Sequence, residues 1–550
     1  MRKWIDSGSP WVWLTAASVS ASIIMVIGLL LLIAARGLGH FWPADVHTFD
    51  YQNDNGQIIK VAGEVRETEE VPTHQIIDSG IKLETDAELT TRHLIKTGNR
   101  ELYGIDFRWL IDPLITQRAL PEDVMVIERR EWGNFYGFLL QVKVDGKLIA
   151  EGPESWDVLV QQIENTSEIY SDIRDIEKGD IGSINYSMER LRLKQRGLEL
   201  KGEDTPLALA RIEEERQSLQ AEYETLQGEL QGLYAELNRA SLVAETIDGK
   251  VVEIDVSKTV QAYRPNGMTV FGKVEFYMHK LWEFVSDEPR EANTEGGIFP
   301  AIFGTVMMVI IMSIIVTPFG VVAAIYLREY AKQGPLIRMV RIAVNNLAGV
   351  PSIVYGVFGL GFFVYFLGGN IDALFFPEAA PAPTFGTPGL MWASITLALL
   401  TVPVVIVATE EGLSRIPKSI REGSLALGAT KAETLWRTII PMTSPAIMTG
   451  LILAVARAAG EVAPLMLVGV VKLAPTLPLD GNFPFLHLDR KFMHLGFHIY
   501  DVGFQSPNVE AARPLVYATA LLLVIVIIVL NLAAIAIRNR LREKYKSLEQ

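Results

Sequence analysis

The chain has 550 residues, a formal net charge of −14 at pH 7 and no cysteine. The acidic balance argues against a nucleic-acid-binding protein, which needs a basic surface for phosphate contacts. The missing cysteines exclude disulfides, thiolate metal sites and cysteine nucleophiles. Apolar residues make up 49% of the chain and charged residues 21%, which suggests very apolar segments beside a separate polar region.

Six segments are apolar over roughly the 20 residues that an α-helix needs to cross a membrane. They cover residues 11–35, 298–327, 342–367, 390–409, 446–471 and 514–537. The first segment is too long for the apolar core of a signal peptide and lacks a convincing cleavage site, so we interpret it as a retained membrane anchor. The sequence therefore predicts an α-helical polytopic membrane protein with six transmembrane helices.

Basic residues predict the orientation of these helices, because lysine and arginine concentrate in cytoplasmic loops. They occur before the first segment, between the second and third, between the fourth and fifth, and after the sixth: Arg2, Lys3, Arg328, Lys332, Arg338, Arg341, Arg415, Lys418, Arg421, Lys431, Arg437, Arg538, Arg540, Arg542, Lys544 and Lys546. The loop over residues 368–389 has none, whereas the loop over 472–513 fits less well, with Lys472, Arg490 and Lys491. We therefore expect both termini in the cytoplasm and the polar region over residues 41–297 outside it.

A heptad pattern marks the middle of this polar region. Ile212, Leu219, Leu226 and Leu233 recur every seven residues, and an upstream arm over residues 184–198 keeps the same spacing. A polar stretch over residues 201–206 separates the two arms, so we interpret the pattern as an antiparallel coiled-coil hairpin over about residues 167–242. The alternative is that the same residues form the buried face of an ordinary helical bundle.

Two stretches that flank the hairpin have the alternation of β-strands. They read FYGFLLQVKVDGKLIAEG at residues 135–152 and SLVAETIDGKVVEIDVSK at residues 241–258, each with a central Asp-Gly pair. Asp-Gly between apolar alternations is typical of a β-hairpin turn. We therefore expect a mixed α/β insertion, with a small β module at the base of the helical hairpin and no catalytic residue.

The segment over residues 411–445 is longer than a simple connector between two membrane helices. It contains REGSLALGATKAETLWRTIIP at residues 421–441. Gly428 suits the position just after a helix, where a left-handed backbone is common. Thr430 and Glu433 have the spacing of a capping box, which predicts that a second helix starts there. We expect that helix to stop at Pro441.

Trp436 lies on this second predicted helix and would be exposed unless something covers it. In one interpretation, the two short helices form a rigid projection that docks on a cytoplasmic partner. In the other, they form a lid that packs only against the membrane helices of this chain.

Two polar elements lie within or beside the apolar segments. Arg457 and Glu461 are four residues apart near the middle of the fifth segment, so they share a helical face and can pair. A charge there costs about 2.5–3.5 kcal/mol on insertion scales, which favours a functional role. Asn345 and Ser352 flank a proline break at the start of the third segment, and broken helices often lie near transporter substrates. The alternatives are a structural cross-link and a packing kink, respectively.

The 421–441 stretch resembles the "EAA" loop of binding-protein-dependent ABC importer permeases. Glu422, Gly428 and Pro441 have the spacing of that motif, while Gly423 and Ser424 replace its two alanines with other small residues. The resemblance implies that Glu422 and its neighbours transmit the closure of a separate ATPase to the membrane helices. The chain has no GxxxxGK[ST] motif, so it lacks a Walker A nucleotide site of its own.

Four stretches resemble more specifically the PstA family of phosphate importer permeases. They read GGIFPAIFGT, LAGVPSIVYGVFG, SLALGATKAETLWRTIIP and ARAAGEVAPL, all between residues 296 and 540. The resemblance implies a transport subunit in a bacterial inner membrane that performs no catalysis itself and needs no metal ion or cofactor. The implied partners are a cytoplasmic ATPase dimer, a second homologous permease subunit and a periplasmic phosphate-binding protein.

This interpretation divides the chain into three parts. Residues 1–40 form an N-terminal anchor, residues 41–297 a periplasmic insertion, and residues 298–550 a permease core with five transmembrane helices and a coupling loop at 411–445. The expected pathway residues are Arg457, Glu461, Asn345 and Ser352. Two alternatives remain open, a membrane-anchored sensor or scaffold of phosphate signalling and a permease of the same architecture for another oxyanion.

Overall fold

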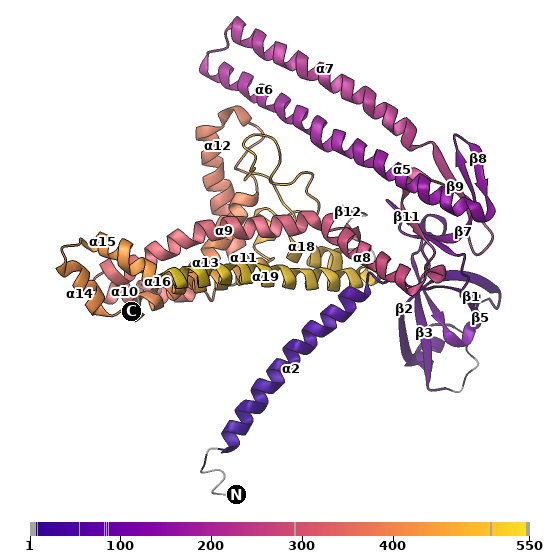
Figure 1. Ribbon diagram of the computed structural model, residues 1–550, viewed down its shortest axis with the longest axis horizontal. Helices are drawn as coiled ribbons and strands as arrows, with labels where there is room; N and C mark the ends of the chain where they lie inside the picture. The colour runs from indigo at the N-terminus through magenta and orange to yellow at the C-terminus, as the bar shows by residue number, and fades with distance from the viewer. Residues whose placement is uncertain are drawn as a thin grey trace. The chain divides into compact units, whose positions relative to one another are not determined.

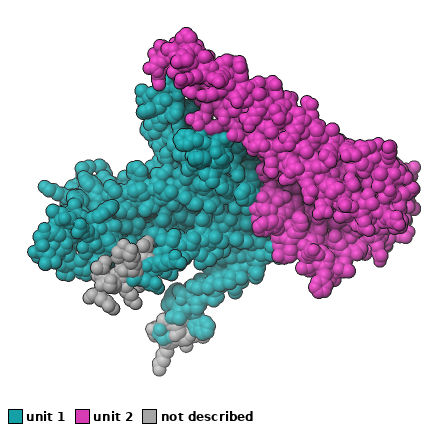
Figure 2. Space-filling view, turned by 45° about the horizontal axis from the view of Figure 1, so that its top comes forward, with its two compact units in different colours: residues 1–40, 298–550 teal, residues 41–297 magenta. Residues whose placement is uncertain are grey.

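The computed structural model describes residues 7, 9–53, 55–81, 83, 85, 87–290, 293–506 and 509–545 (Figure 1). Arg2, Lys3 and Lys546, which were used to predict the orientation, lie outside the described residues. The chain forms two compact units, which Figure 2 shows in different colours. Unit 1 comprises residues 1–40 and 298–550, and unit 2 comprises residues 41–297.

Six helices in the described part of unit 1 are long and apolar enough to cross a membrane, as the sequence predicts. They are α2 (Ser9–Gly39), α9 (Phe299–Ile325) with the following turn η7 (Tyr326–Tyr330), α11 (Ser352–Phe358) continued by η8 (Gly359–Gly368) and α12 (Gly369–Phe375), α13 (Leu390–Arg415), α15 (Lys431–Thr434) continued by η10 (Leu435–Ile439) and α16 (Ile440–Gly460), and α19 (Val509–Tyr545). The shorter helices of this unit are α10 (Pro335–Leu347), α14 (Lys418–Ala426), α17 (Leu465–Val468) and α18 (Leu495–Tyr500).

Helix α13 is the central helix of unit 1 and packs against both α9 and α16. Small residues permit this close approach, as in other membrane helix pairs. A Cβ atom on Gly412 would lie 2.4 Å from the Cβ of Ala446, and one on Gly450 would lie 2.8 Å from the Cβ of Ala408. Helix α2 contacts α19, where a Cβ on Gly37 would lie 2.9 Å from the Tyr517 carbonyl oxygen.

Prolines correct two of the predicted membrane segments. The third helix starts at Ser352 rather than at residue 342, because Pro351 interrupts the helical bonding and leaves α10 as a separate amphipathic helix. The fifth ends at Gly460 rather than at residue 471. Pro464 has no N–H to donate to the Gly460 carbonyl, so the apolar run after it continues without the helix.

The described part of unit 2 contains two large antiparallel sheets and is richer in strands than the predicted small β module. The five-stranded sheet has the order β4-β3-β2-β1-β5, with β1 (Val46–Gln52), β2 (Ile58–Pro72), β3 (Leu89–Lys96), β4 (Phe107–Ile111) and β5 (Ile115–Ala119). The six-stranded sheet has the order β10-β9-β7-β6-β11, with β8 paired to β7; its strands are β6 (Met125–Arg129), β7 (Phe135–Val144), β8 (Lys147–Glu151), β9 (Ala240–Glu245), β10 (Val251–Asp255) and β11 (Thr259–Tyr263). Two Asp-Gly turns, with left-handed glycines at Gly146 and Gly249, join β7 to β8 and β9 to β10 as predicted.

Two long helical arms rise from the six-stranded sheet (Figure 1). The first arm runs through α5 (Ser155–Asp175), η3 (Ile176–Asp180) and α6 (Ile181–Lys201), and α7 (Pro206–Leu237) returns beside it. Ile173 and Ile176 pack with Leu230 and Leu237. The first arm begins at Ser155 rather than near residue 167, and residues 240–242 belong to β9 rather than to the second arm.

The last helix of unit 2 is α8 (Val270–Ser286), which follows β11. The described part of unit 2 also contains the short helices α3 (Thr73–Asp78) and α4 (Arg100–Tyr103) and a two-stranded ladder of β12 (Pro289–Arg290) with β13 (Glu295–Gly296). Thr269 caps α8 by accepting a hydrogen bond from the Gly272 N–H.

Candidate functional site

The segment over residues 418–439, here called the loop, has the predicted break and cap. Gly428 follows α14 with a left-handed φ of +89°. The Thr430 N–H donates to Glu433 Oε2 at 2.8 Å, and the Glu433 N–H donates to Thr430 Oγ1 at 3.2 Å, which completes the capping box. These local interactions fix where the second helix starts.

The second helix does not stop at Pro441, contrary to the prediction. It continues through η10 and α16 to Gly460. The Ile440 N–H donates to the Leu435 carbonyl, five residues earlier, instead of to the carbonyl four residues earlier. The helix therefore forms a wider, π-helical turn at this point. A widened turn just before Pro441 accommodates a residue that cannot donate a backbone hydrogen bond. The loop is therefore continuous with the membrane helix α16.

Apolar side chains attach the inner face of the loop to the membrane helices. Leu435 and Ile439 are buried, and they pack with Leu413 and Ile416 at the end of α13. The lid interpretation requires contacts of this kind with the chain's own helices, and Leu435 and Ile439 make them. The loop is therefore packed against the end of α13.

Polar contacts attach the loop to the end of α9 as well. Arg421 Nη2 donates to Glu329 Oε1 at 2.9 Å and to the Leu413 carbonyl at 2.8 Å. Lys431 Nζ donates to the Glu329 carbonyl oxygen and lies 4.4 Å from the centre of the Tyr330 ring. The side chains of Arg421 and Glu329 are largely buried, at 20% and 12% exposed, so this pair is better shielded from solvent than a surface ion pair.

Glu329 and Tyr330 were not predicted as part of the site. The available signal was an acidic residue among the basic residues that follow the second apolar segment, at LREYAKQGPLIR. Periodicity alone does not show that this carboxylate meets Arg421, which is 92 residues later in the chain.

The outer part of the loop leaves large apolar side chains in solvent. Trp436 is 76% exposed and Leu427 is 91% exposed, and Leu425 is 46% exposed. Glu422, the first residue of the motif-like spacing, is also exposed. Exposed apolar groups on a rigid, capped support are typical of a protein docking surface. Packing on the chain's own helices accounts for Leu435 and Ile439 but not for these residues.

Arg457 and Glu461 lie together, but at a helix end rather than in the middle of a membrane helix. Arg457 is in the last turn of α16, and Glu461 follows the helix with an extended backbone. Arg457 Nε and Glu461 Oε1 are 3.6 Å apart, and the two side chains are 32% and 20% exposed. This distance is long for a hydrogen bond, so the guanidinium retains donors for another acceptor.

The helix break at Pro351, where α11 begins, lies close to the break that ends α16 at Gly460. A Cβ on Gly356 of α11 would lie 2.7 Å from Pro464 Cα, so the first turns of α11 lie against the chain that follows Glu461. Ser352 starts α11 and is half-buried. Asn345 is exposed on the separate helix α10. The structure thus brings the helix of Ser352 close to the Arg457–Glu461 region and leaves Asn345 on another element.

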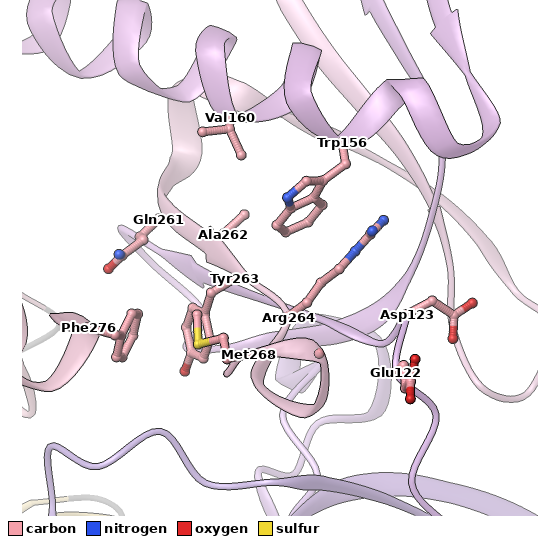
Figure 3. A pocket seen from close by; sticks show the side chains of 11 residues that line it. Glu122, Asp123, Trp156, Val160, Gln261, Ala262, Tyr263, Arg264, Met268 and Phe276 are labelled. Atoms are coloured by element: carbon pink, nitrogen blue, oxygen red, sulfur yellow. The ribbon is translucent and has the colours of Figure 1, made fainter. Parts of the chain in front are cut away.

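Unit 2 contains a separate cavity of about 630 Å³ (Figure 3). Trp156, Tyr263, Met268 and Phe276 supply apolar walls, and the Arg264 guanidinium lies 4.2 Å from the centre of the Trp156 ring. This stacking occupies one face of the only basic side chain among those that line the cavity. Within the described residues, no group of three or more His, Asp or Glu side chains is placed to hold a metal ion.

Known proteins match the half of the chain that contains the loop and the Arg457–Glu461 pair. Residues 316–546 match the family described as "Binding-protein-dependent transport system inner membrane component". The phosphate transport system permease protein PstA of Yersinia pestis is 34% identical over 259 residues, which are 46% of this chain and 76% of that protein. The chain belongs to this family of inner-membrane permeases.

Other similarities of this permease are partial. PstA of Mycobacterium leprae (strain TN) is 35% identical over 223 residues, which cover 40% of this permease and 66% of that protein, so the match spans about two thirds of that relative. A structure titled as an inward-facing conformation of the MetNI methionine ABC transporter matches at 18% identity with a TM-score of 0.33, covering 44% of this permease and 94% of that chain. The family match lies entirely within unit 1, after the end of unit 2.

Proposed function

We propose that this permease is a transmembrane subunit of an ATP-driven importer of inorganic phosphate. Relatives named as phosphate transport system permeases share 34–35% identity with it over more than 220 residues. The single structural observation that supports the role is the loop, which is fixed to three membrane helices and exposes Trp436 and Leu427. A subunit without a Walker A site needs such a contact to receive work from an ATPase.

The coupling route follows from the contacts of the loop. A partner ATPase that moves Glu422, Leu427 and Trp436 would pull on α16, because the second loop helix is continuous with it. It would also pull on α9 and α13 through Arg421 and through the packing of Leu435. Thr430 and Glu433 keep the start of the second helix intact during this movement. We assign the coupling role to this loop.

The phosphate pathway in this proposal passes Arg457. A guanidinium binds oxyanions through several donors at once, and Glu461, at 3.6 Å, weakens that attraction enough for release. Ser352 belongs to the helix beside this region. Asn345 is exposed on another element, α10, so we assign it to a different part of the pathway from the Arg457 contact.

In this proposal the loop and both termini lie in the cytoplasm and unit 2 lies in the periplasm. The reason is that lysine and arginine residues concentrate in the loop and in the other segments on its side of the membrane. The partners are a cytoplasmic ATPase dimer, a second homologous permease subunit and a periplasmic phosphate-binding protein. This set of partners is consistent with the family description, which names a binding-protein-dependent transport system.

Reconstitution of the complete complex tests this proposal. The complex is purified through a tag on this chain, placed in proteoliposomes, and assayed for ATP-dependent uptake of radioactive phosphate, with sulfate, molybdate and methylphosphonate as competitors. We expect uptake that needs ATP and that only unlabelled phosphate competes away. Preferential uptake of another oxyanion would contradict the substrate, and ATP hydrolysis without any uptake would contradict the transport role.

A sensor function is the second candidate, and the helical arms of unit 2 favour it. The arms lie outside the residues that match the permease family. Leu200 and Leu207 near their tip are 50% and 67% exposed, as expected for a surface that meets another protein. On this alternative the arms report the state of the importer, and their removal changes signalling rather than uptake.

A further inference from the structure

Helix α8 presents an apolar face away from the rest of unit 2. Val270, Val274, Met278 and Trp282 recur every four residues, which places them on one side of the helix. They and Phe271 are strongly exposed: Val270 74%, Phe271 88%, Val274 44%, Met278 59% and Trp282 69%. Contiguous exposed apolar residues of this size mark a surface that meets lipid or protein.

The opposite face of α8 is buried, and there the ion-paired side chains of Lys280 and Glu283 lie on the same side as the rings of Phe276 and Phe284. Lys280 Nζ is 2.6 Å from carboxylate oxygens of both Glu128 and Glu283, and the Lys280 side chain is 11% exposed. Arg290 Nη2 lies 3.0 Å from Glu283 Oε1. A surface helix of a water-soluble domain turns its apolar side chains inward and polar side chains to water. Contact with water therefore does not explain why α8 has an apolar face that points outward.

The covalent chain keeps α8 close to the end of a membrane helix. Helix α2 ends at Gly39, and the next aromatic residues pack on α8. The rings of Phe41 and Phe284 have centroids 4.9 Å apart, and those of Trp42 and Tyr277 are 5.8 Å apart. Two or three residues of chain reach at most about 7–11 Å. The middle and the end of α8 are therefore close to the end of α2. The distance between them is at most two or three residues of chain plus the length of one aromatic side chain.

We propose that α8 lies along the membrane surface, with its apolar face in the boundary between lipid headgroups and acyl chains. Trp282, and Trp42 at 43% exposed, are of the residue type that concentrates at this depth. Amphipathic helices with tryptophan, phenylalanine and aliphatic residues on one face bind at this boundary. Lipid is favoured over a protein partner because the chain itself fixes α8 beside a membrane helix end, where lipid is present in every state of the complex.

Because this chain has no cysteine, a single introduced cysteine is labelled specifically in site-directed spin labelling. Single cysteines replace Met278 and Phe271 on the apolar face, and His279→Cys labels the exposed polar side of the same helix. Leu207→Cys, 67% exposed near the tip of the helical arms, is a matched control for an exposed apolar position in water. The labelled full chain is reconstituted in phosphatidylcholine–phosphatidylglycerol vesicles, and collision rates with oxygen and with a water-soluble nickel chelate are measured.

We expect labels at 278 and 271 to collide several-fold more with oxygen, relative to the nickel chelate, than labels at 279 and 207. Nickel accessibility at 278 and 271 equal to that at 207 would show that the face is in water and would overturn the proposal. A label that is immobilised and shielded from both reagents would indicate protein packing and would overturn it too. Because the substituted side chains are exposed, two positions that agree exclude a local folding defect as the cause.

Discussion

Arg457 shows how a nearby proline decides the environment of a charged residue. In the sequence it lies near the middle of an apolar run, but Pro464 ends the helix at Gly460 and places Arg457 in the last turn. Its side chain is 32% exposed and its partner Glu461 is 3.6 Å away. The identity of the pair could be predicted from the i, i+4 spacing, whereas its depth depends on where the helix ends.

Replacing Arg457 tests whether it serves the pathway. Arg457→Ala removes every guanidinium donor, so we expect phosphate uptake to be lost while the complex still assembles. Arg457→Lys keeps the charge but loses the planar arrangement of donors, so we expect uptake between the two. Uptake in proteoliposomes and co-purification of the partner subunits are the two measurements.

Arg540→Ala is the matched control, because it removes one cation from an exposed position at the end of α19. We expect this variant to transport phosphate normally. Failure of Arg457→Ala to assemble would instead assign Arg457 a structural role between helices.

The environment of Asp480 leads us to expect that its contribution to stability depends on pH. Burial alone would raise the pKa of Asp480, but hydrogen bonds from the Asn482 N–H, Arg490 and His487 lower this pKa to about 2. The lowered pKa means that Asp480 stabilises the fold above about pH 4, and that this contribution is lost as the pH falls towards 2. We expect Asp480→Asn to lower the thermal unfolding temperature of the solubilised protein at pH 7. The difference from the unmutated protein should shrink as the pH falls; a difference that grows on acidification would contradict this account.

At the scale of elements, the sequence predicted those features of the loop that depend on interactions between residues close together in the chain. The capping box at Thr430 and the left-handed Gly428 follow from residue types a few positions apart. The stop at Pro441 was wrong, because a widened turn accommodates the proline and continues the helix into α16. The Glu329–Arg421 pair was missed because it joins residues far apart in the chain.

Trp436 is the residue whose exposure separates docking from self-packing. We expect Trp436→Ala to reduce co-purification of the ATPase several-fold, because a buried tryptophan is a frequent energetic centre of an interface. The unfolding temperature should change little, since the side chain is 76% exposed. Leu453→Ala, 54% exposed on α16, is the control and should keep the ATPase bound. Unchanged ATPase binding in Trp436→Ala would favour the lid interpretation.

At the scale of the whole molecule, apolar length predicted the six membrane helices, because the bilayer imposes the same length on each. The five-stranded sheet of unit 2 was not predicted. Its longest strand, β2, reads IIKVAGEVRETEEVP and shows no regular alternation of polar and apolar residues, and its pairing with β1 and β3 depends on contacts that no local pattern reveals.

Shortening the helical arms tests what unit 2 contributes. A design that replaces residues 181–229 with a short glycine-rich turn keeps the packing of Ile173 and Ile176 with Leu230 and Leu237. It also keeps the hydrogen bond from Tyr234 to Glu177 at 2.7 Å, so the base of the arms should stay folded. We expect phosphate uptake to persist in cells and in proteoliposomes. Loss of uptake, with the shortened chain still in the membrane complex, would make the arms part of the transport machinery.

The central claim is that the loop transmits ATP hydrolysis to the membrane helices, and Gly428 offers the most direct test. Gly428 has a φ of +89° and Gly423 does not have a left-handed φ, yet neither would place a new Cβ within 4 Å of another residue. Gly428→Val therefore strains the backbone, by about 1–2 kcal/mol, while Gly423→Ala is a matched control without that strain. The measurement is phosphate transported per ATP hydrolysed by the reconstituted complex. The account predicts a ratio that falls sharply in Gly428→Val, with ATP hydrolysis retained, and stays normal in Gly423→Ala; an unchanged ratio in Gly428→Val would contradict it.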